Sequence, residues 1–486
     1  MKKMNESPLF RQQAYVDGRW VGADSGASFD VHDPGTGERL GFVPDMGQIE
    51  TSRAIAAAEA AFADWKNMLA KERSAILRRW YDLIMESADE LAWLMMREQG
   101  KPLKEARGEI NYGASFVEWF AEEAKRTEGD VIPTNGHDRR LLAVREPVGV
   151  CAAITPWNFP SSMITRKVAP AFAAGCTVVV KPAEQTPYSA LALAVLAEKA
   201  GFPKGVFNIV TGDPRAIGAE MTSSRVVRKL SFTGSTEVGR LLMEQCAPTL
   251  KRLSLELGGN APFIVFDDAD IDVAIKGVMG SKYRNSGQTC ICSNRVYVQS
   301  GIYDEFAKRL TAAVSELKTG VGSEDNVRVG PLIDDDALAK VEGLVGDAVD
   351  KGASVMIGGQ RHKLGRTFYE PTVLTQVTSD MRVAKEEIFG PVAPLFSFDT
   401  EEEAIRMAND TEYGLAAYFC SRDVGRVFRV SEALEYGMVA VNTGVFSSEI
   451  FPFGGIKQSG FGREGARNGI DEYLQLKSIC IAGVDK

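Results

Sequence analysis

The feature that most constrains the fold is a regular alternation of strand-like and helix-like segments between residues 148 and 257. Short apolar runs predict buried strands at 148–154, 177–180, 206–210, 229–232 and 252–257. The segments between them predict helices at 161–174, at 189–200, after Pro214 and at 236–246. Such alternation is typical of parallel strands joined by crossover helices, so it predicts a doubly wound α/β sheet. In these sheets, ligands bind beyond the carboxyl ends of the strands.

A second α/β pattern follows the first. It begins with a predicted strand at 262–266 and a helix from residue 270, and it continues to about residue 441. No low-complexity linker separates the two patterns, so the boundary near Gly258-Gly259 is expected to be a turn. The sequence thus predicts one domain from residues 1–125 and 147–258, and a second from residues 259–460.

The remaining segments predict a helical layer and a small β element. Two strand regions come first, and apolar residues then recur at helical spacing; the strands are expected at 14–21 and 28–43, and the helices at 49–68, 71–97 and 104–126. The turn-forming pair Asn135-Gly136 predicts a hairpin, and 473–482 reads as a final strand. Residues 126–146 and 470–486 are therefore assigned to a bridging element, either a subunit contact or an intramolecular edge.

Composition narrows the class of function. The formal net charge of −9, without a long basic run, argues against nucleic-acid binding. No apolar run reaches membrane-spanning length and the N-terminus lacks a secretory stretch, so we expect a cytoplasmic protein without a membrane partner. The seven cysteines form no Cys-x-x-Cys pair and the three histidines form no motif, so no metal site is expected and the thiols should be reduced.

One cysteine stands out as a candidate nucleophile. Cys290 lies in a polar segment shortly after Gly287, where a substrate could reach its thiol. Thiolates attack carbonyl carbon, and Glu256, at the end of a predicted strand, is a candidate general base because desolvation would raise its pKa. The alternative is that Cys290 is a small buried residue and Glu256 a salt-bridged strand end.

Polar residues follow several of the predicted strands. Asn158, between Pro156 and Pro160, could offer a fixed amide N–H to an oxyanion, although it could equally cap a helix. Lys181 and Glu184 follow the next strand, where a carboxylate could accept hydrogen bonds from ribose hydroxyls and repel a 2′-phosphate. Glycines and a helix start at the ends of later strands could face a pyrophosphate, namely Gly212, Gly234 and Ser235. There is no Gly-x-Gly-x-x-Gly.

Seven motifs, in order along almost the whole chain, resemble the aldehyde dehydrogenase superfamily: Thr155-Pro156-Trp157-Asn158, Lys181-Pro182-Ala183-Glu184, Phe232-Thr233-Gly234-Ser235, Leu255-Glu256-Leu257-Gly258-Gly259, Gly287-Gln288-Thr289-Cys290, Glu387-Ile388-Phe389-Gly390-Pro391 and Pro452-Phe453-Gly454-Gly455. The resemblance implies an α/β fold with a doubly wound dinucleotide-binding domain, an α/β catalytic domain and a small β bridging element. It also implies homodimers or homotetramers built through that element.

The resemblance further implies roles for individual residues. Cys290 would be the nucleophile and Glu256 the general base, with Asn158 in the oxyanion hole and Lys167 near the active site. The residues expected to bind NAD or NADP, with NAD favoured by Glu184, are Thr155, Pro156, Trp157, Lys181, Glu184, Gly212, Gly234, Ser235, Leu257, Glu387 and Phe389.

Three further segments resemble the substrate pocket of succinate-semialdehyde dehydrogenases, in which two arginines and a serine hold the distal carboxylate. The segments are 163–167, 281–285 and 444–448, and the expected substrate-binding residues are Arg166, Arg284, Ser448 and Phe453. A bidentate arginine would select an acidic aldehyde over a neutral one. Without the resemblance, ordinary surface pairing would explain both arginines.

The sequence therefore predicts oxidation of succinate semialdehyde to succinate through a Cys290 thiohemiacetal and a thioester, with glutarate semialdehyde or other aldehydes as alternative substrates. A cysteine hydrolase would use the same thiol without a dinucleotide, and a non-catalytic relative would lack the nucleophile. Cys292 lies two residues from Cys290 and is a possible redox partner, or else a small packing residue.

Overall fold

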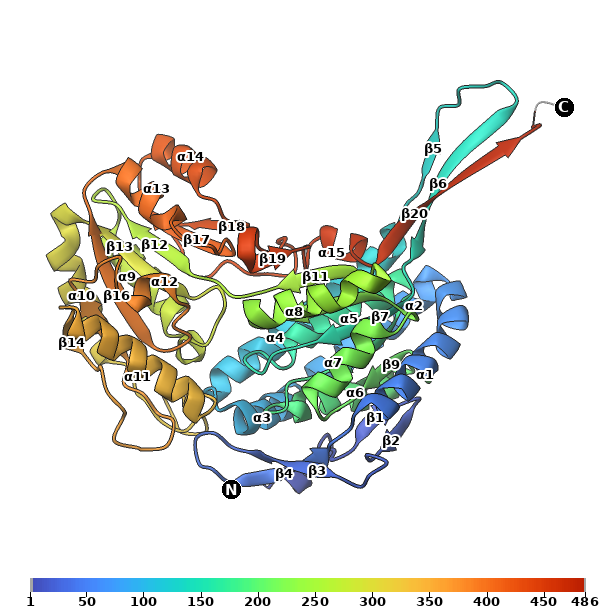
Figure 1. Ribbon diagram of the computed structural model, residues 1–486, viewed down its shortest axis with the longest axis horizontal. Coiled ribbons are helices and arrows are strands. Elements are labelled where there is room, and N and C mark those ends of the chain that lie inside the picture. The colour runs from blue at the N-terminus through green and yellow to red at the C-terminus, as the bar shows by residue number, and fades with distance from the viewer. Residues whose placement is uncertain (1–2, 485–486) are drawn as a thin grey trace.

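A computed structural model describes residues 3–484, and its chain forms two large sheets, a projecting three-stranded sheet and a separate hairpin (Figure 1). The first large sheet has eight strands in the order β19-β11-β10-β7-β8-β9-β1-β2. Its strands are β1 (Ala14–Val16), β2 (Arg19–Val21), β7 (Val150–Ile154), β8 (Thr177–Lys181), β9 (Phe207–Ile209), β10 (Val227–Thr233), β11 (Arg252–Glu256) and β19 (Gly460–Phe461).

The central strands of this sheet run parallel, as the alternation predicted. Ile154 of β7 lies beside Lys181 of β8, and Thr233 of β10 lies beside Glu256 of β11. The carboxyl ends of these strands thus meet at one edge of the sheet. The helices between them are α5 (Ser162–Ala174), α6 (Pro187–Ala200), α7 (Pro214–Ser223) and α8 (Thr236–Cys246), with the 3-10 turn η3 (Ala247–Thr249).

A helical layer from the N-terminal region packs against the sheet through its first helix and against α5 and α6 through the other three. Its members are α1 (Gln48–Asn67), α2 (Ala70–Glu86), α3 (Ala88–Gln99) and α4 (Leu103–Glu123), flanked by η1 (Met4–Glu6) and η2 (Ala124–Arg126). The segment predicted at 71–97 is two helices, because the chain breaks at Ser87. The hairpin of β3 (Ser28–His32) and β4 (Arg39–Pro44) forms a sheet of its own.

The second large sheet has the order β14-β15-β16-β13-β12-β17-β18. Its strands are β12 (Ala261–Val265), β13 (Ser293–Gln299), β14 (Ser354–Ile357), β15 (Thr372–Thr375), β16 (Val392–Phe398), β17 (Ala416–Cys420) and β18 (Met438–Val441). Its helices and turns are α9 (Ile271–Lys282), η4 (Arg284–Gly287), η5 (Ser300–Ile302), α10 (Tyr303–Ser315), α11 (Asp335–Asp350), α12 (Arg382–Lys385), α13 (Glu401–Asn409) and α14 (Val424–Ala433).

The chain passes between the two sheets twice. It leaves the first after β11 and enters the second at β12, through the glycine pair Gly258-Gly259. It returns through η6 (Lys457–Ser459) to β19, which pairs antiparallel with β11. Residues that follow β11 and residues that precede β13 are therefore held close together, although they belong to different sheets.

The three-stranded sheet projects from the body of the molecule (Figure 1). It joins the hairpin of β5 (Asp130–Ile132) and β6 (Arg139–Pro147) to β20 (Leu474–Ala482), which follows α15 (Asn468–Asp471). The predicted hairpin and final strand are thus paired with each other. Several apolar side chains on this arm are exposed, among them Val131, Ile132, Leu476 and Ile481.

No helix within residues 3–484 is both long enough and apolar enough to cross a bilayer.

Candidate active site

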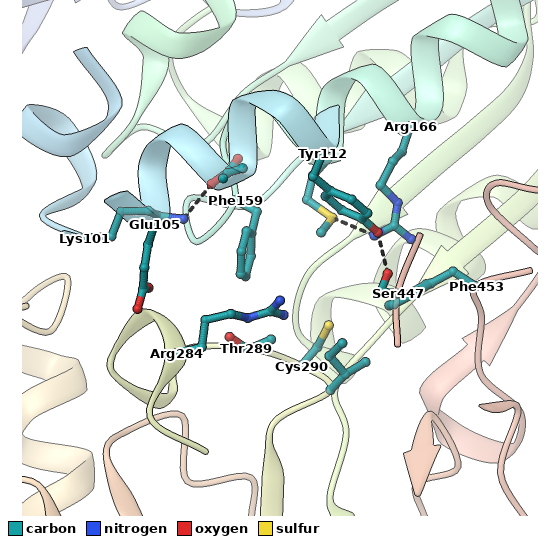
Figure 2. Close-up of a pocket in the computed structure, with 14 residues that line it drawn as sticks. Lys101, Glu105, Tyr112, Phe159, Arg166, Arg284, Thr289, Cys290, Ser447 and Phe453 are labelled. Carbon is teal, nitrogen blue, oxygen red and sulfur yellow. Dashed lines mark hydrogen bonds and ion pairs between the residues drawn. The ribbon is translucent and has the colours of Figure 1, made fainter. Parts of the chain in front are cut away.

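A cavity of about 250 Å³ lies between the first sheet, the helical layer and the loop that precedes β13. Its lining includes Tyr112 of α4, Arg166 of α5, Arg284 of η4 and Cys290 (Figure 2). Residues from α4, α5 and the loop before β13 are far apart in the sequence, and they meet here because the chain passes between the two sheets. The site is therefore assembled at the junction of the two halves of the molecule.

The loop that carries Cys290 has an unusual backbone. Asn285 and Ser286 have φ values of 50° and 57°, in the left-handed region that side chains other than glycine rarely adopt. Gly287 has φ 75°, and a Cβ at that position would overlap the carbonyl oxygen of Gly390. The hydroxyl of Tyr418 also donates a hydrogen bond to the carbonyl of Ile291 at 2.6 Å. The loop thus fixes the position of the thiol.

The Cys290 thiol is partly exposed to the cavity, but its environment disfavours the thiolate. Burial, with the nearby Glu387 carboxyl as the next cause, raises the pKa of Cys290 to about 12. Arg166 and Arg284 lower this pKa but do not offset the burial. The thiol is therefore the main form of Cys290 in the protein without cofactor.

Glu256 is placed as the sequence predicted, at the end of β11. Neither of its carboxyl oxygens has a hydrogen-bond partner within residues 3–484. Burial raises the pKa of Glu256 well above its ordinary value, and the charge of Glu464 raises it further. The predicted direction of the shift is thus confirmed. A carboxylate with a raised pKa is a stronger base than an exposed one.

Asn158 is buried between the two halves of the molecule. Its Nδ2 donates a hydrogen bond to the carbonyl of Gln288 at 2.9 Å, two residues before the candidate nucleophile. The backbone carbonyl of Asn158 accepts hydrogen bonds from Lys101 Nζ at 2.8 Å and from Asn285 Nδ2 at 2.9 Å. One N–H of the carboxamide is therefore committed to the Cys290 loop, and the second is available for another acceptor.

Glu464 is a member of the site that the sequence did not reveal. Its carboxylate forms ion pairs with Lys167 and, at 2.8 Å, with Arg166 Nη2. Burial alone would raise the pKa of Glu464, but Lys167 and Arg166 together lower it, so this carboxyl is ionised. Lys167 and Glu464 are 297 residues apart. No local pattern links positions so distant in the chain.

The two arginines that line the cavity differ in their partners. Arg166 pairs with Glu464, and its guanidinium lies 4.0 Å from the centroid of the Phe453 ring. Arg284 lies 5.4 Å from the Phe159 ring and, within the described chain, has no carboxylate at ion-pair distance and no hydrogen-bond partner for its buried Nε. Figure 2 shows its guanidinium reaching between Phe159 and Thr289 toward Cys290.

The predicted serine is displaced by one residue. Ser447, rather than Ser448, lines the cavity, and its hydroxyl is 2.5 Å from that of Tyr112. The irregular segment 442–450 has no strand or helix periodicity from which the sequence could set the orientation of each side chain. Phe453 lines the cavity as expected.

Comparisons with known proteins agree with this geometry. The model of the aldehyde dehydrogenase family matches residues 20–479. This chain belongs to the aldehyde dehydrogenase family. Glutarate-semialdehyde dehydrogenase of Pseudomonas aeruginosa is 60% identical over 99% of this chain and 100% of its own length. The Escherichia coli protein named succinate-semialdehyde dehydrogenase NADP(+) GabD is 60% identical over 99% of each chain.

Solved structures of the family have the same architecture. The crystal structure of succinate-semialdehyde dehydrogenase from Burkholderia pseudomallei is 64% identical, covers 98% of each chain and superposes with a TM-score of 0.97. The predicted aldehyde dehydrogenase fold is therefore confirmed. The division of this family member into functional domains stays a prediction, although the passage from the first sheet to the second falls at the predicted boundary.

The residues expected to bind a nicotinamide dinucleotide lie at the sheet edge where such cofactors bind in doubly wound folds. Buried hydroxyls of Thr155 and Thr233, at the ends of β7 and β10, have no hydrogen-bond partner within residues 3–484. Lys181 forms an ion pair with the partly exposed Glu184. Ser235 caps α8, accepting a hydrogen bond from the N–H of Val238 at 3.3 Å. Unpartnered hydroxyls beside a helix start fit a polar phosphate- and ribose-containing group.

Other members of the expected set surround this edge. The rings of Trp157 and Phe389 meet edge to face with centroids 5.6 Å apart. The N–H of Gly259 donates to Glu387 at 3.1 Å, and burial raises the pKa of Glu387 to about 7. The remaining expected residues lie on the same edge: Pro156 follows β7, Gly234 follows β10 and Leu257 follows β11.

Gly212 has a different explanation in this structure. It has φ 134°, and a Cβ there would overlap the backbone of Met46, with which it forms an isolated parallel bridge. The glycine is thus required for the packing of the chain before α1 against the end of β9. This packing accounts for the residue without a cofactor.

Cys292 is buried two residues after the nucleophile. Its thiol donates to the carbonyls of Lys282 and Ser293, each at 3.7 Å. All seven cysteines are free, and no disulfide joins Cys290 and Cys292. The proposed redox pairing would need the Cys292 side chain to leave these contacts.

Proposed function

We propose that this protein oxidises short aldehydes that carry a distal acidic group, with succinate semialdehyde as the substrate and succinate as the product. The observation that carries the proposal is Arg284, a cation in the cavity lining without a carboxylate partner in the described chain. A buried cation without a partner is costly, and a substrate carboxylate would supply the missing one. The names of the Pseudomonas and Escherichia relatives, for glutarate and succinate semialdehydes, support the same class of substrate.

The cavity supports a second arginine contact. Arg166 forms an ion pair with Glu464 and also lines the cavity, as do Ser447 and Tyr112 with their hydroxyl groups. A carboxylate held by Arg284 and these groups would place the aldehyde end near Cys290, because both line one cavity of about 250 Å³. Ser448, which does not line this cavity, is replaced by Ser447 in the proposed set.

The proposed chemistry begins at Cys290. The Cys290 thiol loses its proton to water, and the resulting thiolate attacks the aldehyde carbon. The free N–H of Asn158 and the backbone N–H of Cys290 stabilise the oxyanion that forms. A nicotinamide dinucleotide held at the sheet edge by residues such as Thr155, Thr233 and Ser235 would supply the hydride acceptor, and loss of hydride from the adduct would leave a thioester on Cys290. Glu256 then activates the water that hydrolyses the thioester to the acid.

The lysine next to Arg166 completes this arrangement. Lys167 and Arg166 keep Glu464 ionised, and the ionised Glu464 raises the pKa of Glu256. Arg166 and Lys167 also lower the pKa of Glu256 directly, but burial and Glu464 outweigh them, so the pKa of the proposed base stays raised. We assign Lys167 to the catalytic set in this supporting role.

We propose NAD or NADP as the oxidant, with NAD favoured by Glu184. Its carboxylate would accept hydrogen bonds from ribose hydroxyls and repel a 2′-phosphate. The E. coli relative's name specifies NADP(+), and Lys181 beside Glu184 could attract such a phosphate. The ratio of kcat/KM for the two cofactors decides this point, and Glu184→Ala should shift the ratio toward NADP. An unchanged ratio would remove Glu184 from the cofactor choice.

We further propose that the protein is a cytoplasmic homodimer or homotetramer assembled through the projecting arm. The arm carries exposed apolar residues, with Val131 81% and Leu476 64% accessible in the single chain. Exposed side chains of this kind on an extended sheet are suited to burial against a second copy. Light scattering of the wild type and of Val131→Asp with Leu476→Asp tests this, since the double variant should shift toward the monomer.

Initial rates test the proposed substrate class. Succinate semialdehyde, glutarate semialdehyde and the uncharged butanal are compared, each with NAD and with NADP. The acidic aldehydes should have kcat/KM values at least about tenfold above that of butanal, as expected for one charge-assisted hydrogen bond. Equal values for all three aldehydes would contradict the proposal. Turnover of an ester without any nicotinamide cofactor, but none of an aldehyde with it, would favour the hydrolase instead.

A further inference from the structure

A buried ion pair in the cavity lining has no role in the mechanism above. Lys101, two residues before α4, lies with its Nζ 2.5 Å from Glu109 Oε2, and each side chain is only 1% exposed. Replacing a buried ion pair by apolar side chains is often neutral or stabilising. Stability alone therefore does not explain this pair, and its other contacts are more informative.

The first of these contacts is with Asn158. Lys101 Nζ donates to the backbone carbonyl of Asn158 at 2.8 Å, and Asn285 Nδ2 donates to the same oxygen at 2.9 Å. The Lys101 amine also lies 4.1 Å from the centroid of the Phe159 ring. A buried cation thus holds the peptide that joins Asn158 to Phe159.

The second contact is with the start of α5. Glu109 Oε1 accepts hydrogen bonds from the backbone N–H of Ser161 at 3.0 Å and of Ser162 at 3.1 Å. The N-cap residue Ser161 makes no side-chain capping bond of its own. A carboxylate from α4 therefore caps the helix that carries Arg166 and Lys167. One ion pair fixes both the Asn158 loop and the helix that follows it.

We propose that Lys101 and Glu109 are positioning residues that orient the carboxamide of Asn158 toward the oxyanion formed at Cys290. The carboxamide has one N–H on the carbonyl of Gln288, so the direction of the second depends on where the Asn158 backbone is held. A misplacement of about 1 Å at a reacting centre can cost about a hundredfold in rate. Lys101 acts through Asn158 and does not touch the reacting atoms. The inference rests on the oxyanion role of Asn158 in the proposed function.

A double-mutant cycle tests this proposal. Lys101→Met is made in the wild type and in Asn158→Ala, and kcat is measured with saturating succinate semialdehyde and NAD. In the wild type, kcat should fall about 10- to 100-fold with little change in KM, as expected for a displaced oxyanion donor. In Asn158→Ala, the same change should cost less than about twofold, because residues that act as a unit are not additive.

The outcomes distinguish a failure of the positioning role of Lys101 from a failure of the oxyanion role of Asn158. Equal losses from Lys101→Met in both backgrounds would overturn the inference and leave the oxyanion role of Asn158 intact. Wild-type kcat in Asn158→Ala would overturn that role, and the inference with it. If Lys101→Met does not fold, Glu109→Gln replaces it in the cycle, since it removes the charge but keeps an acceptor for the two N–H groups.

Two further measurements exclude a general loss of structure. Arg97→Met removes a cation from another buried pair, with Asp33 at 3.0 Å, outside the cavity lining. It should lower Tm and leave kcat near that of the wild type. Alkylation of Cys290 by iodoacetamide needs no oxyanion donor, so Lys101→Met should leave its rate unchanged within about twofold. An alkylation rate that falls as far as kcat would show an effect on the thiol itself and overturn the inference.

Discussion

The cations that line the cavity and the carboxyl groups near Cys290 are all buried or half-buried, but burial has different consequences for them. Lys101 and Arg166 each have a carboxylate within 2.8 Å, in Glu109 and Glu464 respectively. Glu256 and Glu387 have no cation at ion-pair distance in the described chain, and burial raises the pKa of both. The carboxylates of the chain thus neutralise these two cations, which leaves Arg284 as the cavity charge suited to an anionic substrate. The carboxyl groups beside it are suited to taking up and releasing protons.

Arg284 and Glu256 are the extreme cases on each side. Arg284 is the cavity cation for which the described chain supplies no carboxylate, and Glu256 is the carboxyl whose two oxygens have no partner there. A buried polar group that lacks a partner is costly, so such groups tend to be kept where a ligand or a proton completes them. The unpaired side chains, Arg284 and Glu256, are therefore proposed to bind the substrate and to accept a proton, respectively.

The largest expected effect comes from replacing the nucleophile, Cys290, which lies near both the cavity cations and the carboxyl groups. Cys290→Ala should lower kcat by at least about a thousandfold and leave the Kd for NAD nearly unchanged, because the thiol forms the covalent adduct. Stopped-flow absorbance and fluorescence titration measure the two quantities. Cys480→Ala, which removes an exposed thiol, is the matched control. Activity of Cys290→Ala within tenfold of the wild type would be incompatible with this assignment.

The next largest effect is on substrate binding, and it should distinguish Arg284 from Arg166. Arg284→Ala should raise KM for succinate semialdehyde about 10- to 100-fold, the cost of a lost charge-assisted bond, and change KM for butanal little. Arg166→Ala should show the same selectivity, together with a lower Tm, because Glu464 would keep only Lys167 as an ionic partner. Arg284→Lys retains the charge but loses the bidentate geometry, and it should lie between wild type and Arg284→Ala.

Equal changes in KM for both aldehydes would remove these arginines from the carboxylate pocket. A drop in Tm for Arg284→Ala as large as that for Arg166→Ala would contradict the difference in their partners.

The pKa of Cys290 predicts a smaller effect that depends on pH. In the protein without cofactor, burial raises this pKa to about 12, so the thiolate fraction should increase about tenfold per pH unit through the neutral and mildly alkaline range. The rate of Cys290 alkylation by iodoacetamide, followed by peptide mass spectrometry from pH 7 to 10, measures that fraction. The rate should rise throughout. A plateau reached below pH 8 would mean that the cations of the cavity wall outweigh burial.

The smallest expected effect concerns Cys292. A Cys290–Cys292 disulfide would consume the nucleophile, and peroxide should then inactivate the wild type reversibly with dithiothreitol. Cys292→Ala should resist peroxide or lose activity irreversibly by further oxidation of Cys290. The contacts of Cys292 with two carbonyls oppose this pairing. If variant and wild type inactivate and recover alike, or if the peptide shows no loss of two hydrogens, Cys292 has only a packing role.

Local patterns predicted the architecture well. The apolar strands and amphipathic helices between residues 148 and 257 are all present, because burial in a parallel sheet leaves a signal in each short segment. The break between α2 and α3 at Ser87 was missed, since the helical periodicity continues across it. Gly212 packs on Met46, and its cofactor contact stays a prediction, because the sequence of a glycine does not show which close approach requires it.

The site was predictable only in part. The motifs identified Cys290, Glu256 and Asn158, but not the electrostatic balance that raises the pKa of the thiol, because that balance depends on groups from both sheets. Glu464 and Lys101 were missed for the same reason, as their partners lie far away in the chain or on another element. The choice of Ser448 over Ser447 failed in an irregular segment, where a shift of one residue changes which side chain faces the cavity.

The most direct test of the account is to trap the thioester in Glu256→Gln. The variant is mixed with succinate semialdehyde and NAD, and reduced cofactor and the mass of the Cys290 peptide are followed together. We expect a burst of about one equivalent of reduced cofactor per active site, followed by slow turnover, because hydrolysis lacks its base. During the slow phase, the Cys290 peptide should carry a succinyl group. A steady rate without a burst would contradict the role of Glu256 as the base for hydrolysis alone. A burst with Cys290 unmodified would contradict the thioester on Cys290.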